Sequence, residues 1–274
     1  MTLLCSVIFA NAQELYVSTE PASNMATGSI GLRLNSKLFQ MKYNNSYSVR
    51  IDPEIMFGVS KKLMIHLNAY GSNMYQSSLK FEGGSFYAKY RFLSIDDVHN
   101  HFRMAAFGKI SAIENPPSLY ANNKYYKSDE IDLDGSNSGF LSGIVATQLL
   151  HKLALSSSVA YTHGFTNINQ SKEIGQAAQA INYSLSAGYL LFPVEYKNFD
   201  QTNVNLYCEM LGSSSIDGKG YYVDIAPAVQ FIFNSIARLD LSYRTQLTGT
   251  MERLSNDYFL LRFEYNFLNI FKNR

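Results

Sequence analysis

The chain lacks several features that mark common protein classes. It has no tryptophan, two cysteines, five histidines and only 16% charged residues over 274 positions. Its formal net charge of +1 gives no argument for binding nucleic acid. If Cys5 is removed with a leader peptide, Cys208 is the sole cysteine, and an intrachain disulfide is then excluded.

The chain also lacks an apolar run long enough for a membrane-spanning helix, and no segment has the pattern of a soluble core helix. It is rich in tyrosine (20) and phenylalanine (18) instead. In the stretch 257–268, DYFLLRFEYNFL, aromatic and aliphatic residues alternate with polar ones. A period of two indicates a strand with one apolar face and one polar face.

This alternation recurs along the whole chain and predicts an all-β fold. Repeated strands of about ten residues, apolar on one side and polar on the other, are typical of transmembrane barrels. In lipid, only helices and closed barrels satisfy every backbone polar group. We therefore predict a single up-and-down antiparallel transmembrane β-barrel of about 12 strands, closed by the last one. The predicted strands are 28–39, 47–59, 63–70, 80–93, 101–113, 138–150, 152–165, 180–191, 202–211, 221–233, 238–247 and 257–268.

The connections predict the orientation. Short turns near Ser60, His151 and Asn234 alternate with longer polar loops, the longest of them 114–135. Outer-membrane barrels have short periplasmic turns and longer external loops, so both termini are predicted to be periplasmic. Pro53 and Pro227 fall on outward positions, where proline cannot donate to the ladder, and we expect a bulge or a locally broken pair at each.

The N-terminus resembles a secretory signal peptide. The apolar run 2–10 precedes Ala10-Asn11-Ala12, an A-x-A site that predicts a signal peptide over 1–12 and a mature start at Gln13. A buried N-terminal strand is the alternative. We expect 13–27 to be a periplasmic N-terminal segment or a partial plug, and 28–274 to form the barrel.

These features predict residence in the cell outer membrane of a Gram-negative bacterium. The expected partners are outer-membrane lipid and the barrel-assembly machinery, to which the aromatic-rich last strand would be presented. No nucleic acid is expected as a partner.

Charged and polar residues on the inward positions form the candidate site. Buried charges are costly unless they are paired or hydrated, so one interpretation is a structural ion-pair network that fills the lumen. The other is a polar pathway for a solute, in which arginine and lysine attract anionic groups. The candidate lumen-lining residues are Arg33, Arg50, Asp52, Glu54, His66, Lys89, Arg91, Arg103, Glu209, Asp224, Asp240, Arg244, Arg262 and Glu264.

Three of these residues carry a specific prediction. Arg50, Asp52 and Glu54 stand at i, i+2 and i+4 of one strand and therefore share its inner face. Burying these three charges without partners would cost too much free energy in a narrow barrel. We expect a hydrogen-bonded charge network that narrows the lumen, with partners on the neighbouring strands: Arg33, Lys37 and His66.

Catalysis and cofactors are not expected. The stretch 135–139 has Asn137 where a G-x-S-x-G motif has its nucleophile, and no His/Cys/Asp cluster has metal-ligand spacing. The acidic stretch 129–134, DEIDLD, is either a Ca²⁺ loop or a solvated acidic loop, and the solvated loop is the simpler interpretation.

Several segments resemble a family of mostly uncharacterised outer-membrane barrels of the Bacteroidota. They are YVSTEPASNM, PEIMFGVSKKLMIHL, YAKYRFLS, ATQLLHKLALS, INYSLSAGYLLFPVEYKNF and YYVDIAPAVQFIFNS. In architecture the chain is similar to the transporter-like barrels named for the phenol-degradation MetA pathway. That resemblance implies passage of small, often hydrophobic, compounds, and it assigns no functional residues.

Two functions remain open. The first is a passive channel or transporter for a small-molecule solute of unknown identity. The alternative is a non-conducting structural or interaction barrel whose external loops bind a partner. An open lumen favours the channel, whereas a lumen filled by 14–27 or by paired side chains favours the alternative.

Overall fold

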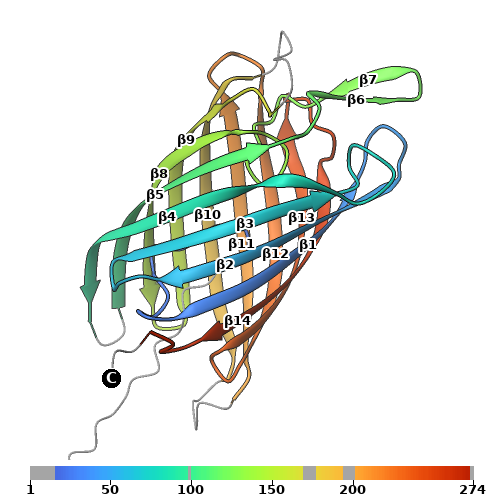
Figure 1. The fold of residues 1–274 in the computed structure, drawn as a ribbon. Helices are drawn as coiled ribbons and strands as arrows, with labels where there is room; N and C mark the ends of the chain where they lie inside the picture. The colour runs from blue at the N-terminus through green and yellow to red at the C-terminus, as the bar shows by residue number, and fades with distance from the viewer. Residues whose placement is uncertain (1–15, 98–99, 169–176, 194–200, 272–274) are drawn as a thin grey trace, which may run out of the picture.

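Twelve strands form one closed antiparallel barrel in the computed structural model, which describes residues 16–97, 100–168, 177–193 and 201–271 (Figure 1). The strands of the barrel are β1 (Ile30–Gln40), β2 (Tyr47–Gly58), β3 (Leu63–Ser72), β4 (Lys80–Asp96), β5 (Asn100–Ile113), β8 (Gly139–Leu150), β9 (Leu153–Gly164), β10 (Gln179–Phe192), β11 (Asn203–Ser215), β12 (Tyr221–Phe233), β13 (Ala237–Gly249) and β14 (Asp257–Phe267). Within the described ranges, no helix is long and apolar enough to cross a membrane.

The predicted fold class is confirmed, because each predicted strand overlaps one barrel strand. The last strand closes the barrel as predicted: β14 pairs with β1 from Ile30↔Phe267 to Gln40↔Asp257. Closure gives every strand two neighbours and leaves no open edge. The predicted signal peptide and the mature start at Gln13 lie outside the described residues.

A hairpin outside the barrel is not predicted by the sequence analysis. β6 (Ser118–Ala121) and β7 (Lys124–Lys127) pair within the long connection between β5 and β8 and project from the barrel mouth (Figure 1). Asn122 and Asn123, at φ values of 50° and 59°, form its two-residue turn. Asparagine tolerates positive φ, so the Asn-Asn pair could have predicted the turn. The two strands, however, are too short to show a clear period of two.

Both outward prolines interrupt the ladder on one side, as predicted. β2 pairs with β3 through Ile51↔Gly71 and resumes at Glu54↔Asn68, which leaves Asp52 and Pro53 unpaired on that side. The register is the same before and after the gap, so this is a broken pair and not a bulge. β12 and β13 have the same kind of gap at Ala226 and Pro227.

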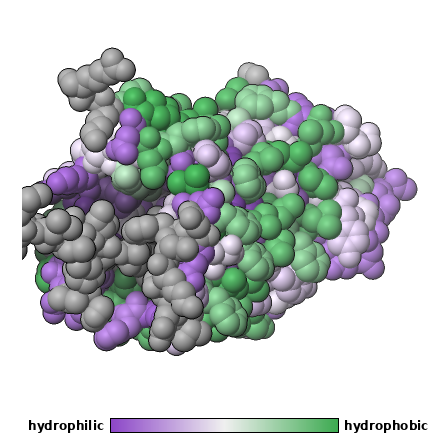
Figure 2. Space-filling view, turned by 90° about the horizontal axis from the view of Figure 1, so that it is seen from below, coloured by the Kyte–Doolittle hydropathy of each residue, from purple (hydrophilic) through white to green (hydrophobic). Residues whose placement is uncertain are grey.

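The inner and outer faces follow the predicted alternation. The outward residues Leu185, Leu261 and Phe263 are 52%, 47% and 49% exposed, whereas Arg50 and Asp224 on inward positions are almost fully buried. Figure 2 shows hydrophobic side chains over much of the barrel wall and hydrophilic ones towards its right-hand edge. A closed barrel with an apolar outside and a polar inside satisfies the requirements for spanning a membrane.

The two ends of the barrel differ in their connections. β1 begins and β14 ends at the lower end in Figure 1, here called the terminal end, and the backbone N–H of Phe271 donates to the carbonyl of Gly28 there. The connections at this end are short, except the one between β10 and β11. The opposite end, here called the loop end, carries the long connection with the hairpin.

Candidate functional site: a chamber inside the barrel

Arg33 on β1 is the centre of the largest ion-pair cluster in the lumen. Its Nε lies 2.7 Å from Glu264 of β14, and its Nη1 lies 3.1 Å from Glu54 of β2 and 2.7 Å from Glu20. Arg33 is directly opposite both Glu264 and Glu54 in the strand register. The register of the closed barrel therefore brings together charges that are 21 and 231 positions apart in sequence.

The predicted partners of Asp52 and Glu54 are confirmed. Lys37 Nζ lies 2.9 Å from Asp52, Arg33 reaches Glu54, and His66 Nδ1 forms a short hydrogen bond with Glu54. These pairs line the interior beside β1, β2 and β3. The prediction that they form a charge network inside the lumen is correct.

Arg50 makes contacts that the sequence analysis misses. Its Nε lies 3.2 Å from Glu82 of β4 and its Nη1 lies 3.0 Å from Asp132 of the long connection. Glu82 escapes prediction because a register shift between Tyr70 and Gly71 reverses the facing of the start of β4. The sequence feature that marks this register shift is Gly83. Its φ is 144°, and it approaches the Ala112 carbonyl oxygen so closely that a Cβ would lie 2.1 Å from it.

A second cluster joins β12, β13 and β14. Asp224 lies 2.6 Å from Arg244 and 2.9 Å from Arg253, a residue of the β13–β14 loop. Asp240 lies 3.3 Å from Arg238 and 3.7 Å from Arg262. Arg238 shares the inward period of its strand, whereas Arg253 lies in a loop where no period could reveal it.

The N-terminal segment 16–25 lies inside the lumen, where Glu209 of β11 binds its backbone. The Glu209 carboxylate accepts hydrogen bonds from the backbone N–H groups of Val17 at 2.9 Å, Ser18 at 2.6 Å and Thr19 at 2.9 Å. Three backbone donors on one carboxylate make a strong charge-assisted anchor. Glu209 therefore binds the segment and does not line an open path.

Basic residues of the wall bind the carbonyls of the same segment. Lys89 Nζ donates to Pro21 O at 2.5 Å and Ser23 O at 2.7 Å, and Arg262 donates to the carbonyls of Tyr16 and Val17. Arg103 donates to Ser23 Oγ at 2.9 Å. Five of the predicted lumen-lining residues thus bind the segment: Lys89, Arg103, Glu209, Arg262 and Arg33, which pairs with Glu20.

Arg91 lies towards one end of its strand. Its Nη2 donates to the carbonyl of Lys61 in the turn between β2 and β3, at the terminal end. A register shift between Arg91 and Leu93 marks the end of the regular period there. Arg91 therefore belongs to the barrel rim.

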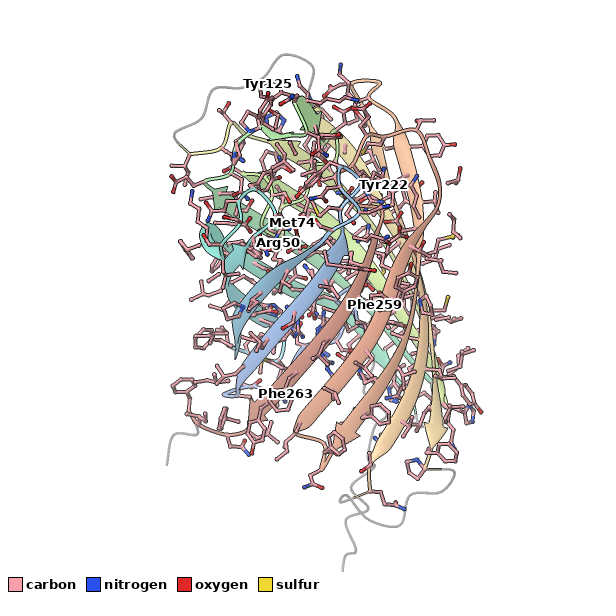
Figure 3. All side chains as sticks on the ribbon, turned by 90° about the vertical axis from the view of Figure 1, so that its right-hand side faces the viewer. Arg50, Met74, Tyr125, Tyr222, Phe259 and Phe263 are labelled. Atoms are coloured by element: carbon pink, nitrogen blue, oxygen red, sulfur yellow. The ribbon has the colours of Figure 1, made fainter. Side chains whose placement is uncertain are left out.

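The acidic stretch 129–134 folds inward and covers the loop end. Asp132 pairs with Arg50, Asp134 pairs with Lys109 of β5, and Glu130 lies 2.8 Å from Arg253. Burial would raise the pKa of Asp132 and Asp134, but Arg50 and Lys109 outweigh it and hold both pKa values below the ordinary range. The prediction of a solvated acidic loop is wrong, because three of its carboxylates form ion pairs with Arg50, Lys109 and Arg253 at the loop end. Figure 3 shows Arg50 and Met74 near this end and Phe263 lower on the wall.

Between the N-terminal segment and this cover lies a chamber of about 340 Å³. Its charged side comes from β1–β5, β13 and β14, here called the charged wall. Its other side comes from β8–β10, here called the uncharged wall, since these strands contain no Lys, Arg, Asp or Glu. The lining includes Glu20, Arg33, Lys37, Asp52, Glu54, His66, Tyr70, Tyr87, Phe107, Lys109, Ser158, Asn182, Ser184, Tyr258 and Arg262.

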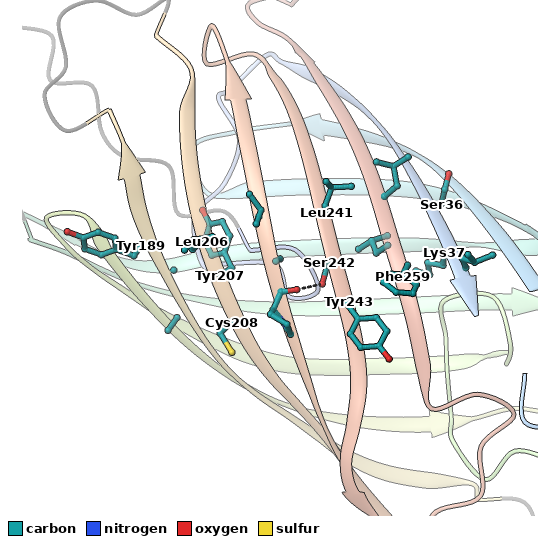
Figure 4. Close-up of a pocket in the computed structure, with 18 of the residues that line it drawn as sticks. Ser36, Lys37, Tyr189, Leu206, Tyr207, Cys208, Leu241, Ser242, Tyr243 and Phe259 are labelled. Carbon is teal, nitrogen blue, oxygen red and sulfur yellow. Dashed lines mark hydrogen bonds between the residues drawn. The ribbon is translucent and has the colours of Figure 1, made fainter. Parts of the chain in front are cut away.

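A larger hollow, about 1000 Å³, is a groove on the outside of the barrel (Figure 4). It crosses β10–β14, and the exposed residues Tyr189, Leu206, Leu241 and Phe259 border it. Its lining is mostly apolar, as the lipid side of a membrane barrel requires. The exposed thiol of Cys208 also faces this groove.

The described residues hold no group of three or more His, Cys, Asp or Glu arranged to bind a metal. The fold and the chamber define the class of protein: a membrane-spanning β-barrel with a partly occupied polar lumen.

Solved structures with this fold include outer-membrane channels. An outer membrane channel from Pseudomonas putida F1 matches with a TM-score of 0.58 and 10% identity, over 92% of this chain and 100% of that chain. The KdgM porin matches with a TM-score of 0.48 and 10% identity, over 86% and 99%. No protein-family profile and no curated protein matches the chain. The resemblance to a Bacteroidota family therefore stays a prediction.

Proposed function

We propose that the protein is a passive channel or transporter for small molecules in the outer membrane, with both termini in the periplasm. The observation that carries this proposal is the chamber of about 340 Å³ inside a barrel with an apolar outside. The segment 16–25 and the ion pairs of Arg33 fill part of the lumen, as expected for the non-conducting alternative, but they leave this polar space between them. The shared fold with an outer membrane channel supports the proposal.

The segment 16–25 and the cover 129–134 line the chamber on the sides that face the two ends of the barrel. Passage of a solute therefore requires movement of both the segment and the cover. The segment is held by hydrogen bonds and ion pairs to Glu209, Lys89 and Arg262, which water can replace, and by apolar packing of Tyr16 and Val17 against the wall.

Conductance in planar bilayers tests the proposal. Replacing residues 16–25 by a Gly-Ser stretch of equal length removes the side-chain contacts of Tyr16 and Glu20 with the barrel. We expect this variant to conduct more than the wild-type protein. A matched control replaces Ser184 by alanine, which leaves the segment in place. Absence of conductance in both folded proteins would favour the alternative, a non-conducting barrel that binds a partner.

A further inference from the structure

We propose that the chamber binds a neutral ring bearing several hydroxyl groups, of about the size of a monosaccharide. This inference rests on the proposed function and names the class of solute. It differs from the interpretation in which arginine and lysine of the lumen attract anions. The argument comes from charge balance, from the uncharged wall and from two unpartnered buried atoms.

Every charged side chain in the described chamber lining lies within salt-bridge distance of an opposite charge. Each of the five Lys and Arg side chains in the described lining has a carboxylate within salt-bridge distance. Each of the six carboxylates in the lining likewise has a cation within that distance. A charged solute would have to break one of these pairs or remain unpaired in a narrow space. Either outcome is expensive, since a buried charge needs a partner. A neutral solute avoids this cost.

The uncharged wall presents small hydroxyl and amide side chains. Ser158 and Ser184 face each other across β9 and β10 with their oxygens 2.6 Å apart, and Asn182 Nδ2 donates to Thr162 Oγ1 at 2.5 Å. Each hydroxyl has one hydrogen and two lone pairs, so the Ser158–Ser184 pair retains bonding capacity for a ligand. Small side chains thus line the chamber on this side.

Two buried polar atoms in the described lining have no hydrogen-bond partner. They are His66 Nε2 and Asp52 Oδ1, on residues that are 2% and 1% exposed. The Asp52 oxygen requires a donor. The His66 nitrogen requires a donor or an acceptor, depending on where its proton lies, and a hydroxyl supplies either. Both atoms are shielded from the chamber, so a solute hydroxyl bonds to them only after neighbouring side chains shift, and it does so without bringing in a charge.

The remaining lining fits a ring. Tyr70, Tyr87, Phe107 and Tyr258 contribute aromatic side chains to the same chamber. Ligand pockets combine such apolar surfaces with a few placed polar groups, and about 340 Å³ lies at the small end of their usual range. The chamber thus suits one small hydroxylated ring.

Tryptophan fluorescence tests the inference directly, because the chain has no tryptophan. Phe107→Trp places a single reporter in the chamber, and Phe259→Trp places one on the outer face as the matched control. We expect glucose to shift the emission of the chamber reporter saturably and to leave the control unchanged. Glucuronate and glucosamine, charged rings of similar size, should bind at least about tenfold more weakly, corresponding to 1.4 kcal/mol.

A second variant checks the site of binding. Combining Phe107→Trp with Ser158→Leu and Ser184→Leu fills the uncharged wall, and glucose binding should then be lost. If this variant does not fold, Ser184→Ala in the same background should weaken glucose binding and leave the barrel intact. Equal or tighter binding of a charged ring, or no response to any of the three sugars, overturns the inference.

Liposome swelling with the same three sugars separates this inference from the proposed function. Glucose binding without passage of any sugar would contradict the channel and support the chamber site. Passage at equal rates for neutral and charged rings, without a saturable signal, would support the channel and contradict the chamber site.

Discussion

The charged wall and the uncharged wall solve the same problem in different ways. Both walls must keep a polar face inside a barrel whose outside is apolar. The charged wall uses long side chains whose charges pair with adjacent strands and with the N-terminal segment, such as Arg33 with three carboxylates around it. The uncharged wall uses short side chains that bond their cross-strand neighbours, such as Thr147 with Ser156 at 3.0 Å.

This difference determines where the free space lies. Ion pairs of the charged wall occupy the lumen and bind the N-terminal segment, whereas the short hydroxyl side chains end close to the backbone. The chamber is left between them. Mutations in the charged wall should therefore affect stability, and mutations in the uncharged wall should affect mainly the solute.

The largest effect is expected for Arg33→Met. It leaves Glu20, Glu54 and Glu264 without their shared cation in a buried setting and should destabilise the barrel by about 3–5 kcal/mol. Urea titration monitored by heat-modifiable gel migration measures this. Arg91→Met is the matched control and should cost less than about 1 kcal/mol, because Arg91 lies at the rim. Equal stabilities of the two variants would contradict the role of Arg33.

The outer faces of the two walls should behave alike. Phe263→Arg next to the charged wall and Leu185→Arg on the uncharged wall each place a charge in lipid, and each should cost about 2–4 kcal/mol near mid-bilayer. The same gel assay measures both, with Phe263→Leu and Leu185→Val as conservative controls. Wild-type folding of Phe263→Arg would show that its facing is misassigned.

A smaller effect is expected where the barrel binds the N-terminal segment. Glu209→Gln removes the charge that accepts from three backbone donors and should weaken binding of the segment by about 1.5–3 kcal/mol. Limited proteolysis of segment 16–25 in the folded barrel reports its release. Asp224→Asn, a buried carboxylate that contacts Arg244 and Arg253 instead, is the matched control and should leave the segment protected.

The last expected effect, a shift in ion selectivity, concerns Asp52→Asn combined with Glu54→Gln. These changes remove two negative charges from the lumen, leave Lys37 without its carboxylate and should favour anions in the pathway. The reversal potential under a salt gradient measures this change. Ser158→Ala, on the uncharged wall, should leave the potential unchanged. An unaltered potential in the folded double variant would restrict Asp52 and Glu54 to a structural role.

Much of the fold is predictable from the sequence because the lipid bilayer enforces a strict local rule. A residue that faces lipid must be apolar and its neighbours must not be, so the period of two reveals both the strand and its facing. The same rule placed Asp52 and Glu54 inside and identified Lys37, Arg33 and His66 as their partners. It failed at Glu82, where a bulge at Gly83 reverses the facing.

The sequence by itself determined the twelve strands, their inward charges and closure by the last strand, because each follows from residues close together in the chain. Only the tertiary structure decided that Glu209 binds the backbone of Val17, that Arg50 pairs with Asp132, and that a chamber remains between segment and cover. These contacts join a loop or a terminus to a distant strand, and such segments carry no period that reveals their partners. Their positions depend on which charged side chains still lack a partner on the adjacent strands once the barrel is closed.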